Sequence, residues 1–267
     1  MARQGKGPIR IKGKLGDLVY TRAGKYGSTV RKLVKAGTKK EEKALKEQYD
    51  RTRYLNVLAS DINTMISANS ELLKSSQFYV YVQRRFRKEP LNNRLLLLCT
   101  LRGLEVNPSY PFCGQGKTLI TATPENKGLR VLLQTKQKPS KEHLEVDSYY
   151  YEVMVGTWTK KEEPGDCELQ LSEWVRFADG RPQFEFFFPK QRGAVHWMLT
   201  VRIRLGKGGI PIEHNQADGM MIADAGSFDA REQLWLQNRQ SQPAIKQLKK
   251  LKPAPKEVVR VKPKRLE

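Results

Sequence analysis

The sequence predicts an α+β protein in four segments, and changes in hydrophobic spacing mark their boundaries. Apolar residues alternate near the N-terminus, recur every three or four residues in the second segment, and gather in seven short β-rich runs in the third. Lys and Pro dominate the fourth. We expect a small basic β meander or arm at 1–38, a three-helix segment at 39–104, an antiparallel β-sandwich at 105–230, and a short helix with an extended basic tail at 231–267.

Three strand-like runs form the first segment. In the first of them, Ile9 and Ile11 alternate with Arg10 and Lys12. The runs "DLVYTR" and "STVRKLV" follow, and glycine-containing turns separate the three. Because an isolated meander is only marginally stable, we expect this one to dock on a larger body, with one apolar face and one basic face.

The spacing of apolar residues changes at Thr38, which is a suitable start for a long helix. Apolar residues then recur at helical spacing from Leu45 onward. Ser70 is a candidate cap for a second helix, and Pro90 ends that helix because proline cannot continue the hydrogen-bond ladder. The run at 91–104 predicts a third helix.

Seven runs rich in β-branched and aromatic residues predict the strands of a sandwich: 117–123, 129–136, 148–159, 167–177, 183–189, 195–205 and 219–228. The Asp179–Gly180 pair predicts a hairpin between the fourth and fifth runs. Aromatic residues such as Tyr149, Tyr151 and Trp197 line these runs. They suit a sandwich core better than a surface for sugar rings or stacked bases, which use the same residue types.

The net charge of +21 is concentrated at the two ends of the chain. Residues 1–40 hold twelve Lys and Arg against one acid, residues 239–267 hold ten against two, and the other 198 residues hold 27 against 25. The ends therefore carry 19 of the 21 net charges. Basic ends around a nearly neutral core are typical of arms that bind a polyanion, although a solvated charged face is the simpler alternative.

We therefore predict a nucleic-acid binding protein that contacts the phosphate backbone without sequence specificity. The sequence leaves DNA, RNA and an acidic protein surface open as partners. The predicted binding residues lie in both arms: Arg10, Lys12, Lys14, Arg22, Lys25, Arg31, Lys32, Lys35, Lys249, Lys250, Lys252, Lys262, Lys264 and Arg265.

No motif in the sequence predicts catalysis, a metal site or a cofactor, so we expect a protein that is not an enzyme. The run "CGQGKT" at 113–118 resembles the end of a phosphate-binding loop, but Pro111 stands where the first glycine belongs. His214 lies near Glu213 and Asp218, a grouping that surface loops produce without any chemistry. His196 lies in an apolar run and is expected in the core or at an interface.

Cysteine usage and the absence of a targeting pattern indicate a cytoplasmic protein. Cys99, Cys113 and Cys167 are an odd number without CxxC spacing, which predicts neither a disulfide framework nor a zinc site. The basic start has no apolar region of the kind that secretory signals contain. No stretch reaches the roughly 18 apolar residues that a membrane span needs.

Two stretches resemble an uncharacterised family of Bacteroidota proteins. One is "KGKLGDLVY" at 12–20, which fits the family pattern K-G-x-[IL]-G-[DN]-[LI]-x-[FY], and the other is "FFFPKQRGAVHWMLTVRIRL" at 186–205, with its proline, short loop and G-A-x-H. The resemblance spans most of residues 8–205 and implies helices followed by strands, with no established activity. The basic tail is not a family feature, and the start is more basic than usual.

That resemblance implies a structural or mobile-element (phage-like) role. It agrees with the alternative prediction of a protein that self-assembles, or belongs to a particle, and whose arms contact neighbouring subunits. An enzyme or a sugar-binding sandwich is the third alternative.

Overall fold

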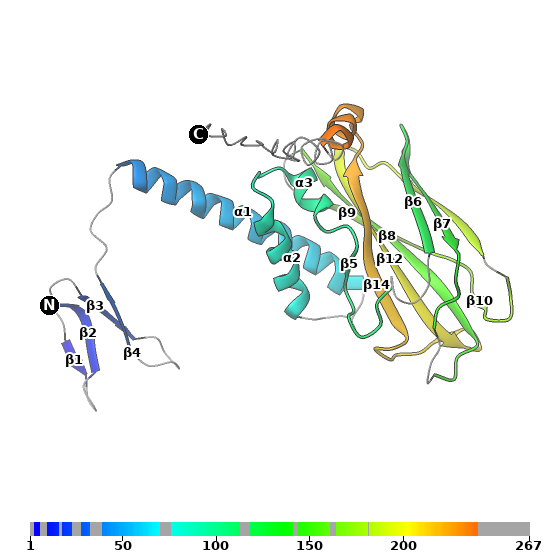
Figure 1. Ribbon diagram of the computed structural model, residues 1–267, viewed down its shortest axis with the longest axis horizontal. Helices are drawn as coiled ribbons and strands as arrows, with labels where there is room; N and C mark the ends of the chain where they lie inside the picture. Colours follow the sequence, from blue (N-terminus) through cyan, green and yellow to red (C-terminus); the bar gives the residue numbers. More distant parts are fainter. Residues whose placement is uncertain are drawn as a thin grey trace, which may run out of the picture. The chain divides into compact units, whose positions relative to one another are not determined.

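The computed structural model describes these stretches of the chain: 3–5, 10–15, 18–22, 28–32, 39–69, 76–112, 118–140, 144–160, 164–180 and 182–239 (Figure 1). Side chains are described from residue 42 onward, apart from positions 76, 164 and 165. The chain divides into two compact units, residues 1–54 and 55–267. The division falls inside helix α1 (Lys39–Asn69).

The first unit contains an antiparallel sheet in the order β1-β2-β3-β4. Its strands are β1 (Arg3–Gly5), β2 (Arg10–Leu15), β3 (Leu18–Arg22) and β4 (Ser28–Lys32). Each strand pairs with the next one along the chain, which is a meander. The sequence predicted three strands and missed β1, because "RQG" contains no β-branched or aromatic residue.

Helices occupy the second segment, as the hydrophobic spacing predicted. They are α1, α2 (Ser76–Lys88) and α3 (Arg94–Cys99). The second half of α1 buries Leu58, Ile62 and Ile66 at four-residue spacing, which is one face of a helix. The predicted cap at Ser70 lies outside the described residues, and α2 begins at Ser76.

Helix α3 is shorter than predicted. Its start is capped by Asn93, whose Oδ1 accepts a hydrogen bond from the backbone N–H of Leu96 at 3.1 Å. It ends at Cys99, and Gly103 then has a φ of 71°, a left-handed conformation that glycine adopts without strain and that directs the chain away from a helix. Residues Leu104–Glu105 form strand β5, so the prediction of a helix up to residue 104 was wrong at its end.

Two antiparallel sheets make up the third segment, which confirms the α+β class. Their strands are β5, β6 (Thr118–Pro124), β7 (Gly128–Thr135), β8 (Ser148–Thr159), β9 (Pro164–Leu171), β10 (Val175–Arg176), β11 (Gln183–Pro189), β12 (Ala194–Lys207), β13 (Ile210–Pro211) and β14 (Asp218–Ser227). The larger sheet has the order β10-β8-β12-β14-β5, with β9 paired to β8 and β13 paired to β12. The smaller sheet has the order β11-β7-β6.

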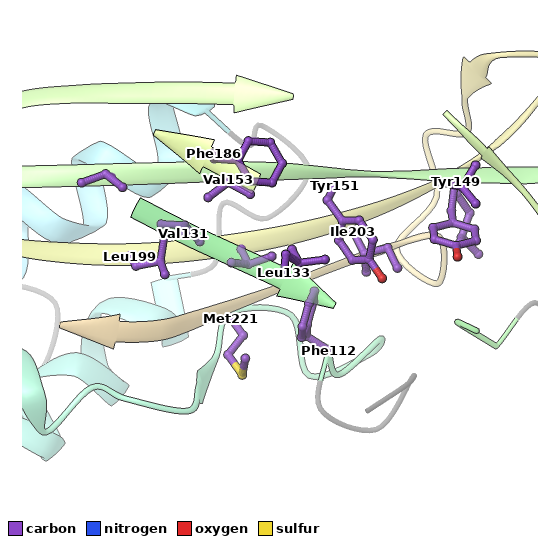
Figure 2. Close-up of a cluster of buried hydrophobic side chains, with 14 of the residues drawn as sticks. Phe112, Val131, Leu133, Tyr149, Tyr151, Val153, Phe186, Leu199, Ile203 and Met221 are labelled. Carbon is purple, nitrogen blue, oxygen red and sulfur yellow. The ribbon is translucent and has the colours of Figure 1, made fainter. Parts of the chain in front are cut away.

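The main core lies between the two sheets, as expected for a sandwich (Figure 2). Alternate residues of β7, such as Val131 and Leu133, meet alternate residues of β8 and β12, such as Tyr151 and Leu199. Tyr151 is fully buried. Its ring makes an edge contact with the ring of Phe112 at a centroid distance of 6.4 Å. These aromatic residues are core residues, which confirms the prediction that they form a core and not a binding surface.

Helices cover the other face of the larger sheet. In Figure 1 the second half of α1, with α2 and α3, lies on the side of this sheet away from β6 and β7. A Cβ atom at Gly156 of β8 would lie 2.2 Å from Sδ of Met65 in α1, so the glycine lets the helix approach the sheet closely. The second unit therefore has three layers in the order helices, larger sheet and smaller sheet. Strand β8 belongs to the middle layer.

The predicted hairpin at Asp179–Gly180 was wrong. Strand β10 pairs with β8 in the larger sheet, whereas β11 pairs with β7 in the smaller one. A two-residue hairpin of the predicted type needs a positive φ at its glycine, and Gly180 has none. The backbone N–H of Asp179 instead donates to the carbonyl of Arg176 at 3.0 Å, in a turn that precedes the crossing between sheets.

The glycine pair Gly208–Gly209 forms the hairpin between β12 and β13. Lys207 is opposite Ile210, and the two glycines between them have φ values of 61° and 78°. Replacing Gly208 with Ala is expected to lower the free energy of unfolding by about 1–2 kcal/mol, the cost of a left-handed non-glycine residue. Urea denaturation would measure it. Gly180→Ala is the control, since it has neither a positive φ nor an atom within 4 Å of the added Cβ; equal stability of the two variants would contradict the hairpin geometry.

A helix at residues 230–239 follows β14, where the sequence predicted a short one. Within the described ranges, no helix combines the length and apolarity needed to cross a membrane.

Candidate nucleic-acid interface

The four-stranded sheet of the first unit places five basic residues at register positions on one face. Residues directly opposite each other in an antiparallel pair share a face, and successive residues of a strand alternate between faces. Lys12 is opposite Arg3, and one residue of β3 is opposite both Lys14 and Arg31. Arg10 precedes Lys12 by two residues and belongs to the same face. We call Arg3, Arg10, Lys12, Lys14 and Arg31 the basic face.

The opposite face of this sheet holds most of its apolar positions, as the sequence predicted. They are Ile11, Leu15, Leu18, Tyr20 and Val30. Arg22 and Lys32 also belong to this face, at the ends of β3 and β4. These two predicted binding residues are therefore separated from Arg10, Lys12, Lys14 and Arg31 by the thickness of the sheet.

The remaining predicted binding residues lie outside the described residues: Lys25, Lys35, Lys249, Lys250, Lys252, Lys262, Lys264 and Arg265.

A second basic surface lies on α2, and the sequence reasoning missed it. Arg84, Arg85, Arg87 and Lys88 are all exposed on this helix. The signal was present in the run "QRRFRK" at 83–88, but counting charge over the whole middle of the chain averaged these cations against distant acids. We call these four residues the α2 basic face.

The grouping of His214 with Glu213 and Asp218 is not a site. Glu213 and His214 are exposed, and Nδ1 of His214 accepts a hydrogen bond from the backbone N–H of Gln216 at 3.2 Å. Asp218 is fully buried and lies against Arg202 instead. Glu213 and His214 therefore do not meet Asp218, although the three are close in the sequence.

Arg202 is the centre of a buried charge network between the larger sheet and the helical layer. Its Nε donates to Oδ1 of Asp218 at 2.7 Å, and its Nη1 donates to Oε2 of Glu152 at 2.8 Å and to the carbonyl of Asn69, the last residue of α1, at 3.0 Å. Burial disfavours the charge on Arg202, but these two carboxylates outweigh it and raise the pKa of the guanidinium. All charges are paired, so the network is structural.

His196 is an interface residue, as the sequence indicated. Its Nε2 lies 3.0 Å from Oε2 of Glu232, in the helix at 230–239. Burial lowers the pKa of His196, and the nearby carboxylate of Glu232 only partly offsets this effect. His143 lies outside the described residues.

A cavity of about 250 Å³ lies beside the helix at 230–239 and contains one ion pair. Nε of Arg102 is 2.6 Å from Oδ1 of Asp224, and burial raises the pKa of that carboxyl. Trp197 also lines the cavity. Because Arg102 and Asp224 neutralise each other, the cavity presents no net charge to a ligand.

A pocket of about 740 Å³ is lined mainly by apolar surface, and Lys160 and Lys190 belong to its wall. Nζ of Lys190 lies 5.2 Å from the ring centroid of Phe228, a cation–π contact. Thr159 and Asp229 also belong to the described lining of this pocket.

Only Thr118 of the run "CGQGKT" lies within the described residues. Thr118 begins strand β6, as predicted, whereas a phosphate-binding loop leads into a helix. Cys99 and Cys167 are free thiols, and Cys113 lies outside the described residues. Among the residues that the structure describes, no three or more His, Cys, Asp or Glu side chains form a group that could hold a metal ion.

Comparisons of the chain with protein-family models, with curated proteins and with solved structures found no match.

Proposed function

We propose that this is a non-enzymatic, cytoplasmic nucleic-acid binding protein that holds a phosphate backbone with its basic arms. The observation that carries the proposal is the register of the first unit, which assigns five cations to one face of a small sheet. Arg10, Lys12 and Lys14 are alternate residues of β2, about 7 Å apart along the strand, and cations at this spacing can follow successive phosphates. The basic tail adds eight net positive charges over residues 239–267.

The basic face is not expected to recognise particular bases. Recognition of bases requires side chains that reach base edges in a groove, and the basic face consists of Lys and Arg alternating with residues of the other face. Contacts of this kind neutralise phosphates, and their contribution to affinity falls steeply with salt.

Lys12→Gln/Lys14→Gln in the full-length protein is expected to flatten the salt dependence of binding. Removing two phosphate contacts should reduce the slope of log K against log salt on duplex DNA by about 1.8, at ~0.9 per contact. A fluorescence-anisotropy salt titration measures the slope.

Arg22→Gln/Lys32→Gln is the matched control, because it removes the same charge from the opposite face of the same sheet. We expect a smaller reduction of the slope in this variant. Equal slopes for the two double variants would show that net charge, and not the basic face, determines binding. Absence of binding by the wild-type protein would reject the proposal altogether.

A structural, self-assembling protein is the second candidate. Among the described strands, β1 and β4 are the edges of the first sheet, and neither pairs with a further strand. An open edge is a template for a strand of another subunit, as the phage-like alternative requires. Light scattering separates the two candidates: growth of large particles without nucleic acid supports assembly, and a monomer at all concentrations contradicts it.

A further inference from the structure

Contacts with the core of the protein fix the orientation of helix α2. Phe78, Val82 and Phe86 are 3%, 0% and 0% exposed, and their four-residue spacing places them on one side of the helix. Nε2 of Gln83 donates to Oδ1 of Asn56 in α1 at 2.7 Å, which holds α2 beside α1. The core therefore fixes the rotation of α2. Arg84, Arg87 and Lys88 lie opposite the buried side, and Arg85 lies at its flank and is also exposed.

The α2 basic face carries cations that nothing in the described structure neutralises. None of Arg84, Arg85, Arg87 and Lys88 forms an ion pair with an acid in the part of the chain that the structure describes. The adjacent acid, Glu89, lies 3.2 Å from Arg239 instead.

Cations in the last turn of a helix stabilise it through the helix dipole. That effect falls off within the last turn, and Arg84 lies before it. Like charges three and four residues apart repel each other, as Arg84 does Arg87 and Lys88. A cluster of four therefore exceeds what helix stability requires, and it is suited to a polyanion.

An exposed aromatic ring adjoins the cations. Tyr81 is 39% exposed, and the guanidinium carbon of Arg84 lies 5.8 Å from its ring centroid. Both residues line a hollow of about 350 Å³, together with Gln77 and Val80. A planar group of about the size of a nucleobase can enter this hollow and stack on the ring, with its phosphates near the cations.

The chemistry of this face distinguishes between partners. A basic helix that binds a membrane inserts a whole apolar face among the lipids. In α2, however, Phe78, Val82 and Phe86 are buried in the core, which leaves only Val80 and Tyr81 exposed among its described apolar side chains. In duplex nucleic acid the base faces are stacked inside the helix and cannot reach Tyr81, whereas single strands leave them free.

We propose that the outward face of α2 is a binding site for single-stranded nucleic acid, in which the α2 basic face holds phosphates and Tyr81 stacks on one base. The inference rests on the proposed function only for the class of partner. Its evidence comes from the folded core and is independent of the arms.

The test is a salt titration of full-length variants on a mixed-sequence single strand of about 16 nucleotides, the upper site size of one binding module. The α2 variant replaces Arg84, Arg85, Arg87 and Lys88 with Gln. We expect the slope of log K against log salt to fall by up to about 2.8, at ~0.7 per phosphate. A matched control replaces four other exposed cations of the core with Gln: Lys127, Lys136, Arg176 and Arg192. Thermal unfolding of each variant verifies that it is folded.

Tyr81 supplies a second readout that charge alone would not affect. Tyr81→Ala is expected to weaken single-strand binding roughly 10-fold with an unchanged salt slope, and Tyr81→Phe should restore it, since stacking needs only the ring. Duplex binding should not change in Tyr81→Ala.

The inference is overturned if the α2 variant loses no more slope than the control variant, or if it loses binding to anionic phospholipid vesicles and keeps binding to single strands. Loss of binding in Lys12→Gln/Lys14→Gln alone would support the arms and reject the α2 site. Loss in the α2 variant alone would do the reverse, so the two proposals can fail separately.

Discussion

Replacing Arg202 with Met is expected to lower the free energy of unfolding by about 3–5 kcal/mol, because the change leaves two buried carboxylates with only the more distant guanidinium of Arg204 as counter-charge. Arg202 is 4% exposed, and Glu152 and Asp218 are 7% and 0% exposed. Arg204 is a weaker partner of the same carboxylates, since its Nη1 lies 3.5 Å from Oε1 of Glu152 and its Nε lies 4.0 Å from Oδ2 of Asp218. The variant also removes the bond to the carbonyl at the end of α1.

Urea denaturation of Arg202→Met, Asp218→Asn and the double variant measures the coupling between the two residues. Arg130→Met is the control, because Arg130 pairs with Glu125 at 2.6 Å but is half exposed, and surface pairs contribute at most about 1 kcal/mol. We expect the double variant to be more stable than the sum of the single changes predicts. A loss of stability in Arg202→Met no larger than in Arg130→Met would mean that water reaches the network.

Phe188→Ala should destabilise the protein by about 3–5 kcal/mol, the usual cost of removing a buried aromatic side chain. Phe188 is 2% exposed on β11, and it belongs to the core between the two sheets. The smaller sheet has only three strands, and β11 is one of its edges, so loss of this side chain removes much of what holds β11 against the larger sheet.

The adjacent residue provides the control. Phe187 lies on the other face of β11 and is 41% exposed, so Phe187→Ala should cost at most about 1 kcal/mol. The two substitutions remove the same atoms from the same strand, and denaturant midpoints compare them directly. Equal losses of stability would contradict the placement of the core between the sheets.

The strands were predictable wherever one face is buried and the other is not, because alternation then appears in the sequence. The run 183–189 became β11 without a change of boundary, and the run 129–136 became β7 with both ends shifted by one residue. Connections were less predictable. Asp179–Gly180 has the composition of a hairpin turn, but which strands pair depends on long-range packing that a dipeptide does not encode.

The site could be predicted only in part. The alternation of Arg10, Lys12 and Lys14 with apolar residues indicated one basic face, but the separation of Arg22 and Lys32 follows from the register of β3 with β4. The α2 basic face could have been found by plotting charge on the helix that the sequence did predict. The Arg202–Asp218 pair could not, because it depends on the pairing of β12 with β14.

Strand β8 determines how the second unit can come apart. It has neighbours on both edges, its residues 149, 151, 153 and 155 lie in the core between the sheets, and Gly156 on its other face lies against Met65 of α1. Neither outer layer can detach without exposing one side of this strand to water. We therefore expect the helices and the sandwich to unfold as one cooperative unit, and the amide protons of β8 to exchange with solvent only through global unfolding.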